Sequence, residues 1–412
     1  MKRLLVANLL FSPRSFGGAT VVAEEIAFRL AASGEWDVTV LSASNYGLQG
    51  QPVVTRTQLR DGIDHYTVNF GGIRTPDALF ETPEVTAEIN AILDRVQPDA
   101  AHLHCIQGLG VGLIDALHDR GVPTVLTTHD YWWLCEKIFM LDYLDRWCGQ
   151  EVIDRKRCLR CAHTSHTLDR RWEKALDCLN KVDAITYPSR YARDQYERNG
   201  APKDRGSVLP NGVTPPGPEF AAKREARSSG RVRFGYIGGP GPLKGWSAIE
   251  RAFPKLDPAK AELVVVDAAT HIGEGWWAKY KFGALEPFVT IVPGYTMETI
   301  DDFFAGIDVL LFLSTWKETF GLTTREAALR GVHVLATDCG APVEHLIDGD
   351  TATILPGMSA SRGLGRALRK LSENGPPTAT EAGSAKIAAE IRSYEGQTTD
   401  VEALLQRAIQ NR

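Results

Sequence analysis

Val309-Leu-Leu-Phe-Leu313 and, after a short gap, Glu318-Thr-Phe-Gly-Leu-Thr-Thr-Arg-Glu326 predict a buried strand, a loop and the start of a helix. The helix would start near Phe320-Gly321-Leu322-Thr323, where free N–H groups and the positive end of the helix dipole favour a phosphate. A carboxylate accepts hydrogen bonds from hydroxyls, so Glu318 suits a sugar and Glu326 a ribose. By itself, the pattern is equally an acidic helix start followed by an exposed helical glutamate.

Similar alternation of strand and helix patterns runs through the whole chain. In the first half, apolar runs typical of strands occur at residues 4–10, 36–41, 101–106, 124–128, 184–187 and 207–209. In the second half they occur at residues 232–237, 262–266, 289–292, 309–313 and 333–337. This alternation predicts an α/β protein whose parallel sheets are built by βαβ crossovers, and the apolar strands predict sheets covered on both faces.

The chain has 412 residues, which is too long for one hydrophobic core and suggests two domains. We expect the first domain at residues 1–214, a linker rich in Pro, Gly and charge at 215–230, and the second domain at 231–395. A last helical pattern at 396–412 is a candidate to pack back onto the first domain. A cleft between two such domains would be a natural ligand site.

Composition excludes several classes of function. The net charge of −5 provides no overall basic field for nucleic acid. No apolar run reaches the roughly 18 residues of a membrane span. The start, Met1-Lys-Arg-Leu-Leu-Val-Ala-Asn-Leu-Leu10, lacks the long apolar region and cleavage site of a signal peptide. We therefore interpret it as the first strand of a cytoplasmic protein.

Six features in order resemble those of the retaining GT-B glycosyltransferases of family 4, also called glycosyl transferases group 1. They are Gly17-Gly18, His102-Leu-His104, Thr128-His129-Asp130-Tyr131-Trp132, Pro210-Asn211-Gly212-Val213, Leu243-Lys244-Gly245 and the pair Glu318/Glu326. The resemblance spans residues 1–356. It implies a GT-B fold, in which two Rossmann-like, doubly wound parallel-sheet domains face a cleft.

The resemblance also implies roles for the donor-binding residues of the second half. Lys244 would bind the donor diphosphate, for which an ammonium point charge is well suited. Phe320, Gly321, Leu322 and Thr323 at the helix start would hold the same phosphates. Glu318 would contact the transferred sugar as a catalytic residue, and Glu326 would bind the ribose. The simpler interpretation of Lys244 is a solvated lysine at a helix start.

In the first half, the resemblance implies that Gly17 and Gly18 let the backbone approach the donor closely, as glycine permits. A plain strand-to-helix turn would explain them equally well. His129 would be catalytic and lie at the reaction centre, although a histidine at a strand end is often structural. His104 fits a structural role better.

The chain departs from the family pattern at Gly238-Gly239, where the family often has Gly-Arg. Arg14, Arg325 or neither replaces that arginine. The resemblance implies retention at the anomeric carbon, with catalysis by positioning and electrostatics. Asp348-Gly349-Asp350 is interpreted as a turn rather than a metal motif, so no catalytic Mg²⁺ or Mn²⁺ is expected.

Four of the seven cysteines gather in an insertion at residues 133–170, namely Cys135, Cys148, Cys158 and Cys161. In a cytoplasmic chain, such clustering indicates a metal rather than disulfides. Four thiolates suit a structural Zn²⁺, and they can equally hold an iron–sulfur cluster; we favour zinc. Free thiols in a loop are the alternative, and His163 and His166 are reserve ligands. Some family members carry a similar cysteine set.

The sequence therefore predicts a glycosyltransferase that moves a sugar from a nucleotide-diphosphate donor to a carbohydrate or lipid-linked acceptor. Aromatic residues of the insertion would stack on acceptor sugars or form the core of the metal site. Arg155-Lys-Arg157 and Arg170-Arg171 would touch anionic lipid headgroups at the inner membrane face if the acceptor is membrane-bound, whereas a solvated basic face is the simpler view. A nucleotide-sugar epimerase of the same fold and a non-catalytic partner subunit remain as alternatives.

Overall fold

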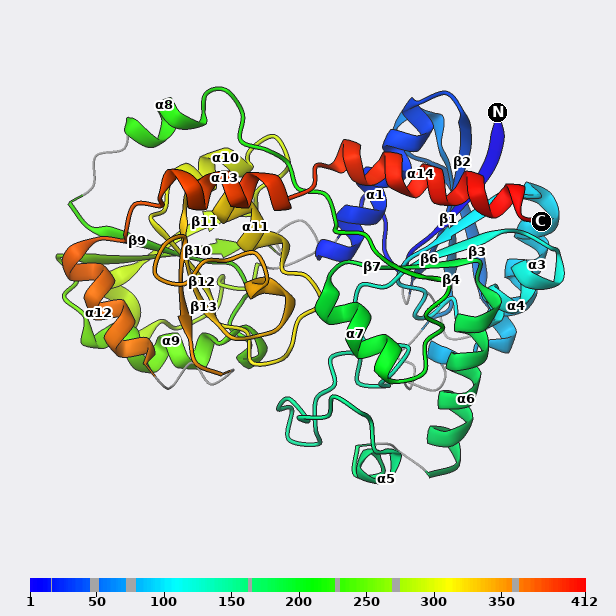
Figure 1. The fold of residues 1–412 in the computed structure, drawn as a ribbon, viewed down its shortest axis with the longest axis horizontal. Helices are drawn as coiled ribbons and strands as arrows, with labels where there is room; N and C mark the ends of the chain where they lie inside the picture. Colours follow the sequence, from blue (N-terminus) through cyan, green and yellow to red (C-terminus); the bar gives the residue numbers. More distant parts are fainter. Residues whose placement is uncertain are drawn as a thin grey trace. The chain divides into compact units, whose positions relative to one another are not determined.

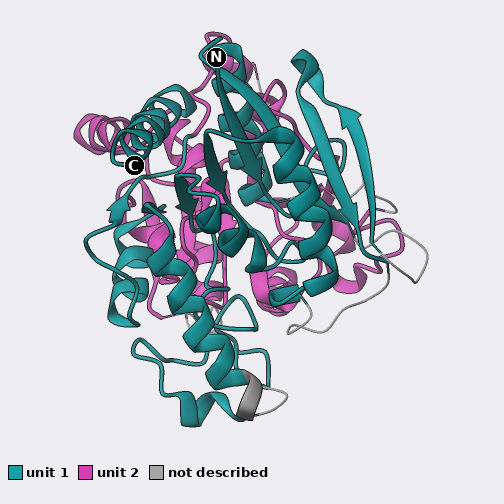
Figure 2. Ribbon diagram, turned by 90° about the vertical axis from the view of Figure 1, so that its right-hand side faces the viewer, with its two compact units in different colours: residues 1–212, 394–412 teal, residues 213–393 magenta. Residues whose placement is uncertain are grey.

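The computed structural model describes residues 1–15, 17–44, 52–71, 79–161, 165–226, 230–268, 275–357 and 363–412. The chain divides into two compact units (Figures 1 and 2). Unit 1 comprises Met1–Gly212 and Tyr394–Arg412, and unit 2 comprises Val213–Ser393.

Unit 1 is built on an eight-stranded sheet with the order β3-β4-β2-β1-β5-β6-β7-β8. The strands are β1 (Lys2–Ala7), β2 (Trp36–Ser44), β3 (Val53–Gln58), β4 (Asp64–Asn69), β5 (Ala100–Leu103), β6 (Thr124–Thr127), β7 (Ala184–Tyr187) and β8 (Gly206–Val208). All neighbouring pairs are parallel except β3 and β4, which form an antiparallel hairpin at the edge. The sequence did not predict this hairpin, because β3 is largely exposed and has no apolar run.

The helices of unit 1 are α1 (Gly18–Ala32), α3 (Pro83–Val96), α4 (Gly112–Asp119), α5 (Arg155–Cys158), α6 (Ser165–Lys181), α7 (Arg190–Arg198) and α14 (Tyr394–Gln410), with a 3-10 turn η1 (Arg60–Gly62). The last helix, α14, packs beside α1 (Figure 1). Its Glu402 accepts a hydrogen bond from the indole of Trp36 at 2.9 Å, and Val401 and Leu405 are buried. The C-terminal segment is therefore part of unit 1.

Unit 2 has a six-stranded, fully parallel sheet with the order β11-β10-β9-β12-β13-β14. The strands are β9 (Val232–Tyr236), β10 (Ala261–Asp267), β11 (Val289–Pro293), β12 (Val309–Phe312), β13 (His333–Thr337) and β14 (Ala352–Leu355). Alternate strand residues enter two separate apolar clusters, as Leu311 and Leu310 do. Both faces of the sheet are therefore covered, as the apolar runs predict.

The helices of unit 2 are α8 (Phe220–Glu225), α9 (Trp246–Ala252), α10 (Ile300–Ala305), α11 (Leu322–Leu329), α12 (Leu364–Asn374) and α13 (Glu381–Glu390). Its 3-10 turns are η2 (Pro242–Lys244), η3 (Phe253–Lys255), η4 (Gly283–Phe288) and η5 (Ala341–Val343). Helix α8 lies inside the predicted linker, where Phe220 is buried in one of the apolar clusters. Arg330 also donates to the carbonyl of Pro215, the first residue of that linker, at 3.4 Å. The start of the predicted linker is therefore a packed part of unit 2.

Candidate functional site

The strand order of unit 2 has a topological switch point at the carboxyl ends of β9 and β12. These strands are neighbours, but the chain continues from β9 toward one edge of the sheet and from β12 toward the other. Ligands bind at such a switch point in open α/β sheets. The loop after β9 carries Lys244, and the loop after β12 carries Glu318. The Nζ atom of Lys244 donates to Oε1 of Glu318 at 2.6 Å.

A tight backbone turn positions Lys244. The 3-10 turn η2 ends at Lys244, and the next residue, Gly245, has φ of +83°. A Cβ at Gly245 would lie 2.2 Å from the carbonyl oxygen of Leu313, so only glycine fits there. The amide of Thr315 donates to the carbonyl of Leu243 at 2.9 Å, which joins the two loops. The ammonium is therefore held over the end of the sheet.

Glu318 is fixed by the neighbouring loop after β13. Its amide donates to the carbonyl of Cys339 at 2.8 Å, and its carbonyl accepts from the amide of Ala341 at 3.2 Å. Its side chain is 9% exposed, whereas that of Lys244 is 37% exposed. The carboxylate is therefore buried against a cation that still faces solvent.

Helix α11 begins at Leu322, within the segment that the sequence predicted. Gly321 is its N-cap with φ of +78°, and a Cβ there would lie 2.8 Å from the ring of Pro342. The first N–H groups of a helix have no partner within it, so those near Leu322 and Thr323 can receive an anion. Phe320 is buried beside this helix start.

Arg325 does not replace the missing family arginine. Its guanidinium donates to the backbone carbonyls of Phe320, Gly321 and Ala341 and stacks 3.7 Å from the ring centroid of Phe320. The side chain is buried, and burial lowers its pKa to about 9. Arg325 therefore stabilises the loop before α11 from inside.

Glu326 is buried one helical turn after the start of α11. The hydroxyl of Tyr295, which follows β11, lies 3.4 Å from its Oε2. Burial raises the pKa of Glu326 to about 7, partly offset by the charge of Arg330. No sequence motif predicted a role for Tyr295, although an aromatic residue directly after a strand at this edge was an available signal.

In unit 1, His129 follows β6 at the same carboxyl edge as His104, which follows β5. Nδ1 of His104 and Nε2 of His129 are 2.8 Å apart, and their rings are stacked at 5.1 Å between centroids. Burial lowers the pKa of His129 to about 4, so the ring is neutral at neutral pH. His129 can exchange hydrogen bonds with a ligand but contributes no positive charge.

The turn around these histidines has further fixed points. Asp130 accepts from the amide of Trp132 at 2.8 Å and from Gln107 at 3.0 Å, and burial raises its pKa to about 6. Asp130 belongs to one of the six sequence motifs, but no role was predicted for it. At the start of α1, Gly17 has φ of +83°, a conformation that favours glycine. Gly18 is the first residue of that helix.

Unit 2 thus brings Lys244 into contact with Glu318, which was predicted from a separate motif. The start of α11 and Glu326 follow Glu318 in the same predicted stretch. Unit 1 holds Gly17, Gly18 and His129, which were predicted to face the same donor and acceptor. The roles of all these residues remain predictions.

The four cysteines of the insertion lie near one another in unit 1. The pKa of Cys135 is raised to about 12, first by burial and then by the charges of Cys148 and Cys158. A cavity of about 530 Å³ is lined by cysteine and basic side chains, among them Cys148, Cys161, Arg146, Lys156, Arg157 and Arg160. Among the described cysteines, no three sulfur atoms lie within 4.8 Å of one another. His163 and the side chain of His166 lie outside the described residues.

A metal ion at this cysteine cluster remains a prediction. Burial, and to a smaller extent the charges of neighbouring cysteines, raises the pKa of Cys135, Cys158 and Cys161, and a divalent cation would stabilise their thiolates. The surrounding basic residues would offset the net negative charge of four thiolates around a divalent ion. Closing such a site requires the sulfur atoms to move closer together.

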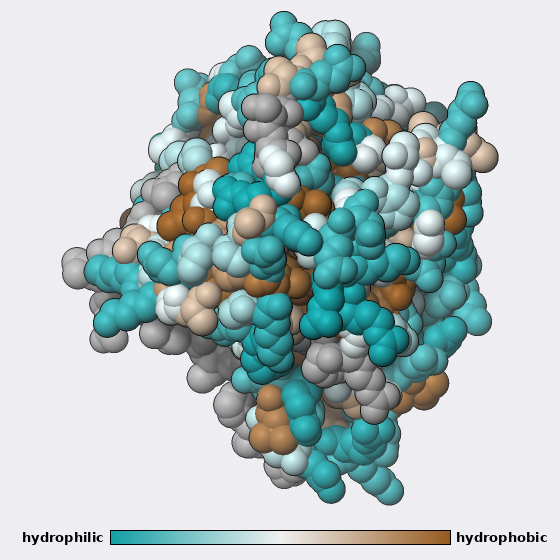
Figure 3. Space-filling view, turned by 90° about the vertical axis from the view of Figure 1, so that its left-hand side faces the viewer, coloured by the Kyte–Doolittle hydropathy of each residue, from teal (hydrophilic) through white to brown (hydrophobic). Residues whose placement is uncertain are grey.

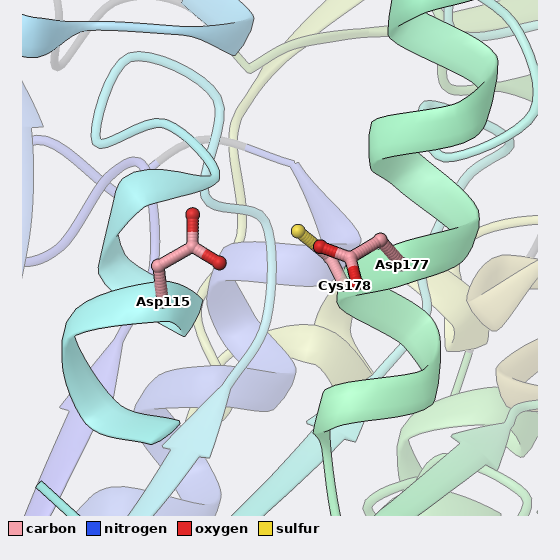
Figure 4. Close-up of side chains that lie close together, drawn as sticks. All are labelled: Asp115, Asp177 and Cys178. Carbon is pink, nitrogen blue, oxygen red and sulfur yellow. The ribbon is translucent and has the colours of Figure 1, made fainter. Parts of the chain in front are cut away.

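Asp115, Asp177 and Cys178, on α4 and α6, form the closest cluster of potential ligands in the described part of the chain (Figure 4). Lys174 and Lys181 already pair with both carboxylates, for example Lys174 with Asp115 at 2.6 Å. Burial raises the pKa of Cys178 to about 12, which keeps its thiol protonated. This cluster is therefore an ion-pair network between two helices.

The Asp-Gly-Asp sequence acts within the backbone of unit 2. Oδ1 of Asp348 accepts from the amide of Ile354 at 2.8 Å. Asp350 accepts from the amide of Thr380 at 2.7 Å and from its hydroxyl at 2.6 Å. These carboxylates hold a turn and the start of α13.

On the face shown in Figure 3, hydrophobic residues form small separate areas within a mostly hydrophilic surface. None of the helices in the described ranges is both long enough and apolar enough to span a membrane.

Two family models match the chain. The model described as Glycosyltransferase Family 4 matches residues 16–216, and the model described as Glycosyl transferases group 1 matches residues 231–374. Sucrose-phosphate synthase from Thermosynechococcus elongatus superposes with a TM-score of 0.73 at 14% identity, and the match covers 100% of both chains. The predicted GT-B fold is confirmed.

Two relatives are similar in sequence. D-inositol 3-phosphate glycosyltransferase of Nocardia farcinica is 26% identical over 56% of this chain and 55% of its own length. GDP-mannose-dependent alpha-(1-6)-phosphatidylinositol monomannoside mannosyltransferase of Mycolicibacterium smegmatis is 27% identical over 43% of this chain and 50% of its own length. The matched region spans about half the length of these relatives.

Proposed function

Because the chain belongs to the family 4 glycosyltransferases of the GT-B fold, we propose that it transfers a sugar from a nucleoside-diphosphate sugar to a hydroxylated acceptor. The observation that carries the proposal is the group at the switch point of unit 2. There an ammonium, a free helix start and two buried carboxylates lie at one edge of the sheet. The ammonium and the helix start suit a diphosphate, and the two carboxylates suit the hydroxyls of a sugar and a ribose.

In this proposal, Lys244 and the amides at the start of α11 bind the diphosphate. Glu318 then exchanges its ion pair with Lys244 for hydroxyls of the transferred sugar. Glu326 accepts a hydrogen bond from a ribose hydroxyl. His129 contacts the sugar at the reaction centre as a neutral ring.

The reaction would proceed with retention. The bond between the anomeric carbon and the diphosphate oxygen breaks, and the acceptor oxygen bonds to the same face of that carbon. The acceptor proton moves to the leaving phosphate oxygen, so no enzymic nucleophile is needed. Lys244 and the dipole of α11 stabilise the leaving charge, which makes catalysis independent of a divalent metal.

The names of the relatives suggest the substrates. One relative is named for GDP-mannose and a phosphatidylinositol mannoside, and the other for inositol 3-phosphate. We infer a carbohydrate or lipid-linked glycan as the acceptor here. A cytoplasmic location, with peripheral contact to the membrane through the basic residues of the insertion, is part of the same proposal.

We also propose that Cys135, Cys148, Cys158 and Cys161 hold a structural Zn²⁺, with an iron–sulfur cluster as the alternative. The ion would staple the insertion, which has little regular structure between residues 133 and 154. Metal analysis of purified protein should find one zinc, lost in Cys148→Ser and retained in Cys178→Ser. Visible absorption with iron would indicate the cluster, and metal-free protein of native stability would contradict both.

The function is tested with a panel of UDP, GDP, ADP and dTDP sugars. A donor should raise the melting temperature of the native protein, because it binds the folded state. Glu318→Ala should abolish transfer while the protein remains folded. Conversion of the donor sugar without any acceptor would indicate an epimerase instead. Failure of every donor to bind folded protein would favour a non-catalytic partner subunit.

A further inference from the structure

Unit 1 contains a second large cavity, of about 600 Å³, and Arg14, a candidate for the missing family arginine, is among the residues that line it. It lies over one face of β3, β4 and β2, the three strands at one end of the sheet. The loop after β1, from Leu9 to Arg14, also lines it. Phe70 and Leu79 complete its apolar walls.

The strand register fills one face of these strands with polar side chains. Ser42 lies opposite Thr67, which lies opposite Thr55, so three hydroxyls cross the sheet in one row. The rows on either side contribute the remaining polar residues of this face, Ser44 and Asn69 on one side and His65 and Thr57 on the other. All of them line the cavity.

These polar groups are organised rather than loosely solvated. Oγ of Ser42 lies 2.7 Å from Nε2 of His65, and Oγ1 of Thr67 lies 3.2 Å from the same nitrogen. Ser42, Ser44 and His65 are each less than 9% exposed. Buried hydroxyls and a buried imidazole on a cavity wall can each exchange hydrogen bonds with a hydroxylated ligand.

Arg14 is the only charged residue among the described residues that line the cavity. Its Nη1 donates to Oγ of Ser44 at 3.1 Å, which ties the loop to the end of β2. Burial lowers the pKa of His65 to about 4, so the imidazole adds no charge at neutral pH. The cavity therefore has one fixed positive charge, and a guanidinium matches the geometry of a phosphate or carboxylate.

The loop is held over the strands at several points. The amide of Ala43 donates to the carbonyl of Leu9 at 3.1 Å. Phe11 packs between Phe28 of α1 and His65, with ring centroids 6.2 and 5.9 Å apart. The loop is thus a fixed wall of the cavity.

We propose that this cavity is a distal acceptor subsite that binds a sugar unit bearing an anionic group, either a phosphate or a carboxylate. This inference rests on the proposed transfer of a sugar to a glycan. The hydroxyl rows bind the ring hydroxyls, and Arg14 binds the anion.

The position of the cavity constrains the length of the acceptor. The cavity and His129 lie at the same carboxyl edge of the sheet. In the strand order, β2 and β6 are separated by three steps of about 4.8 Å, or roughly 14 Å. One sugar ring cannot occupy both places. The acceptor would therefore be an oligosaccharide or an extended glycan whose anionic unit lies several bonds from the hydroxyl that receives the new sugar.

The test measures binding of glucose 6-phosphate, glucuronate, glucose and inorganic phosphate to the full chain by calorimetry, without donor. The variants are Arg14→Gln and Thr67→Val. Arg56→Gln is the matched control, because Arg56 is an exposed arginine of the same hairpin that pairs with Asp64. Glucose 6-phosphate or glucuronate should bind more tightly than glucose or phosphate. Arg14→Gln should weaken that binding about ten-fold or more, Thr67→Val a few-fold, and Arg56→Gln less than two-fold.

The proposal would be overturned if inorganic phosphate or glucose bound as tightly as glucose 6-phosphate and glucuronate, or if none of them bound. It would also be overturned if Arg56→Gln weakened binding as much as Arg14→Gln. Nucleotide binding is measured on the same proteins. Anionic-sugar binding without nucleotide binding would leave this subsite intact and remove the proposed function, whereas the reverse result would remove only the subsite.

Discussion

Replacing the two partners of the Lys244–Glu318 ion pair should move nucleotide affinity in opposite directions. Nζ of Lys244 lies 2.6 Å from Oε1 of Glu318, whose side chain is 9% exposed. A nucleoside diphosphate without its sugar must compete with Glu318 for the ammonium. Lys244→Ala removes the phosphate ligand, whereas Glu318→Gln frees it and preserves the shape of the side chain.

The magnitudes follow from the geometry. A hydrogen bond between charged groups contributes about 1.5–3 kcal/mol, so Lys244→Ala should weaken binding of UDP or GDP about ten- to one-hundred-fold. Lys244 is 37% exposed, so its pair with Glu318 is screened and is worth about 1 kcal/mol. Glu318→Gln should therefore tighten nucleoside-diphosphate binding up to about five-fold, while transfer of the sugar falls by at least two orders of magnitude.

Isothermal titration calorimetry with the nucleoside diphosphate measures the first effect, and initial rates with the sugar donor measure the second. Lys317→Ala is the matched control, since Lys317 is the adjacent lysine but donates to Asp338. Its nucleotide affinity should stay within about two-fold of that of the wild type. Circular dichroism establishes that each variant is folded before it is compared.

If Lys244→Ala and Glu318→Gln weakened nucleoside-diphosphate binding to the same extent, the assignment of Lys244 as the phosphate ligand would be refuted. The pair would then be a structural ion pair whose loss damages the whole site. Equal loss in the Lys317→Ala control would show that general charge, rather than this position, attracts the nucleotide.

Three further predictions concern the same unit. Burial raises the pKa of Glu326 from 4.5 to about 7, so between these pH values the folded state retains a proton that the unfolded state releases. In urea denaturation, the wild type should therefore lose up to ~3 kcal/mol of stability from pH 4.5 to 7 relative to Glu326→Gln. A stability difference that does not change with pH would contradict this burial. Arg325→Met removes the charged donor that the carbonyls of Phe320, Gly321 and Ala341 share and should cost about 1–3 kcal/mol in the same assay. An unchanged midpoint would show that solvent replaces the guanidinium. Gly245→Ala places a Cβ 2.2 Å from the carbonyl oxygen of Leu313, at a residue with positive φ. This variant should have a melting temperature several degrees lower and should not bind the donor. Native donor affinity in this variant would show that the turn can relax.

Much of the fold was predictable because its signals are local. Apolar runs such as residues 309–313 predict buried strands from their own composition, and the helical patterns between them imply parallel pairing. The edge strand β3 escaped prediction because both its faces are polar or exposed. The packed start of the predicted linker also escaped, since a single buried Phe220 among prolines and charges gives no periodic signal.

The site was predictable in part for a related reason. Lys244, Glu318 and Glu326 each follow a strand, and parallel strands end at one edge of the sheet. The sequence could not distinguish between the candidates for the missing arginine. Burial of Arg325 on carbonyls argues against that candidate, and it depends on Ala341, sixteen residues further along the chain.

By itself, the sequence determined the strand–helix alternation, the two-part organisation and the motifs that stand at strand ends, because those properties are carried by neighbouring residues. Tertiary structure alone decided that Lys244 pairs with Glu318 across 74 positions, and that hydroxyls from three strands line one cavity with Arg14. The physical reason is that ion pairing, burial and cavity walls depend on which strands become neighbours and in what register. That choice is made by packing across the whole sheet rather than by any local pattern.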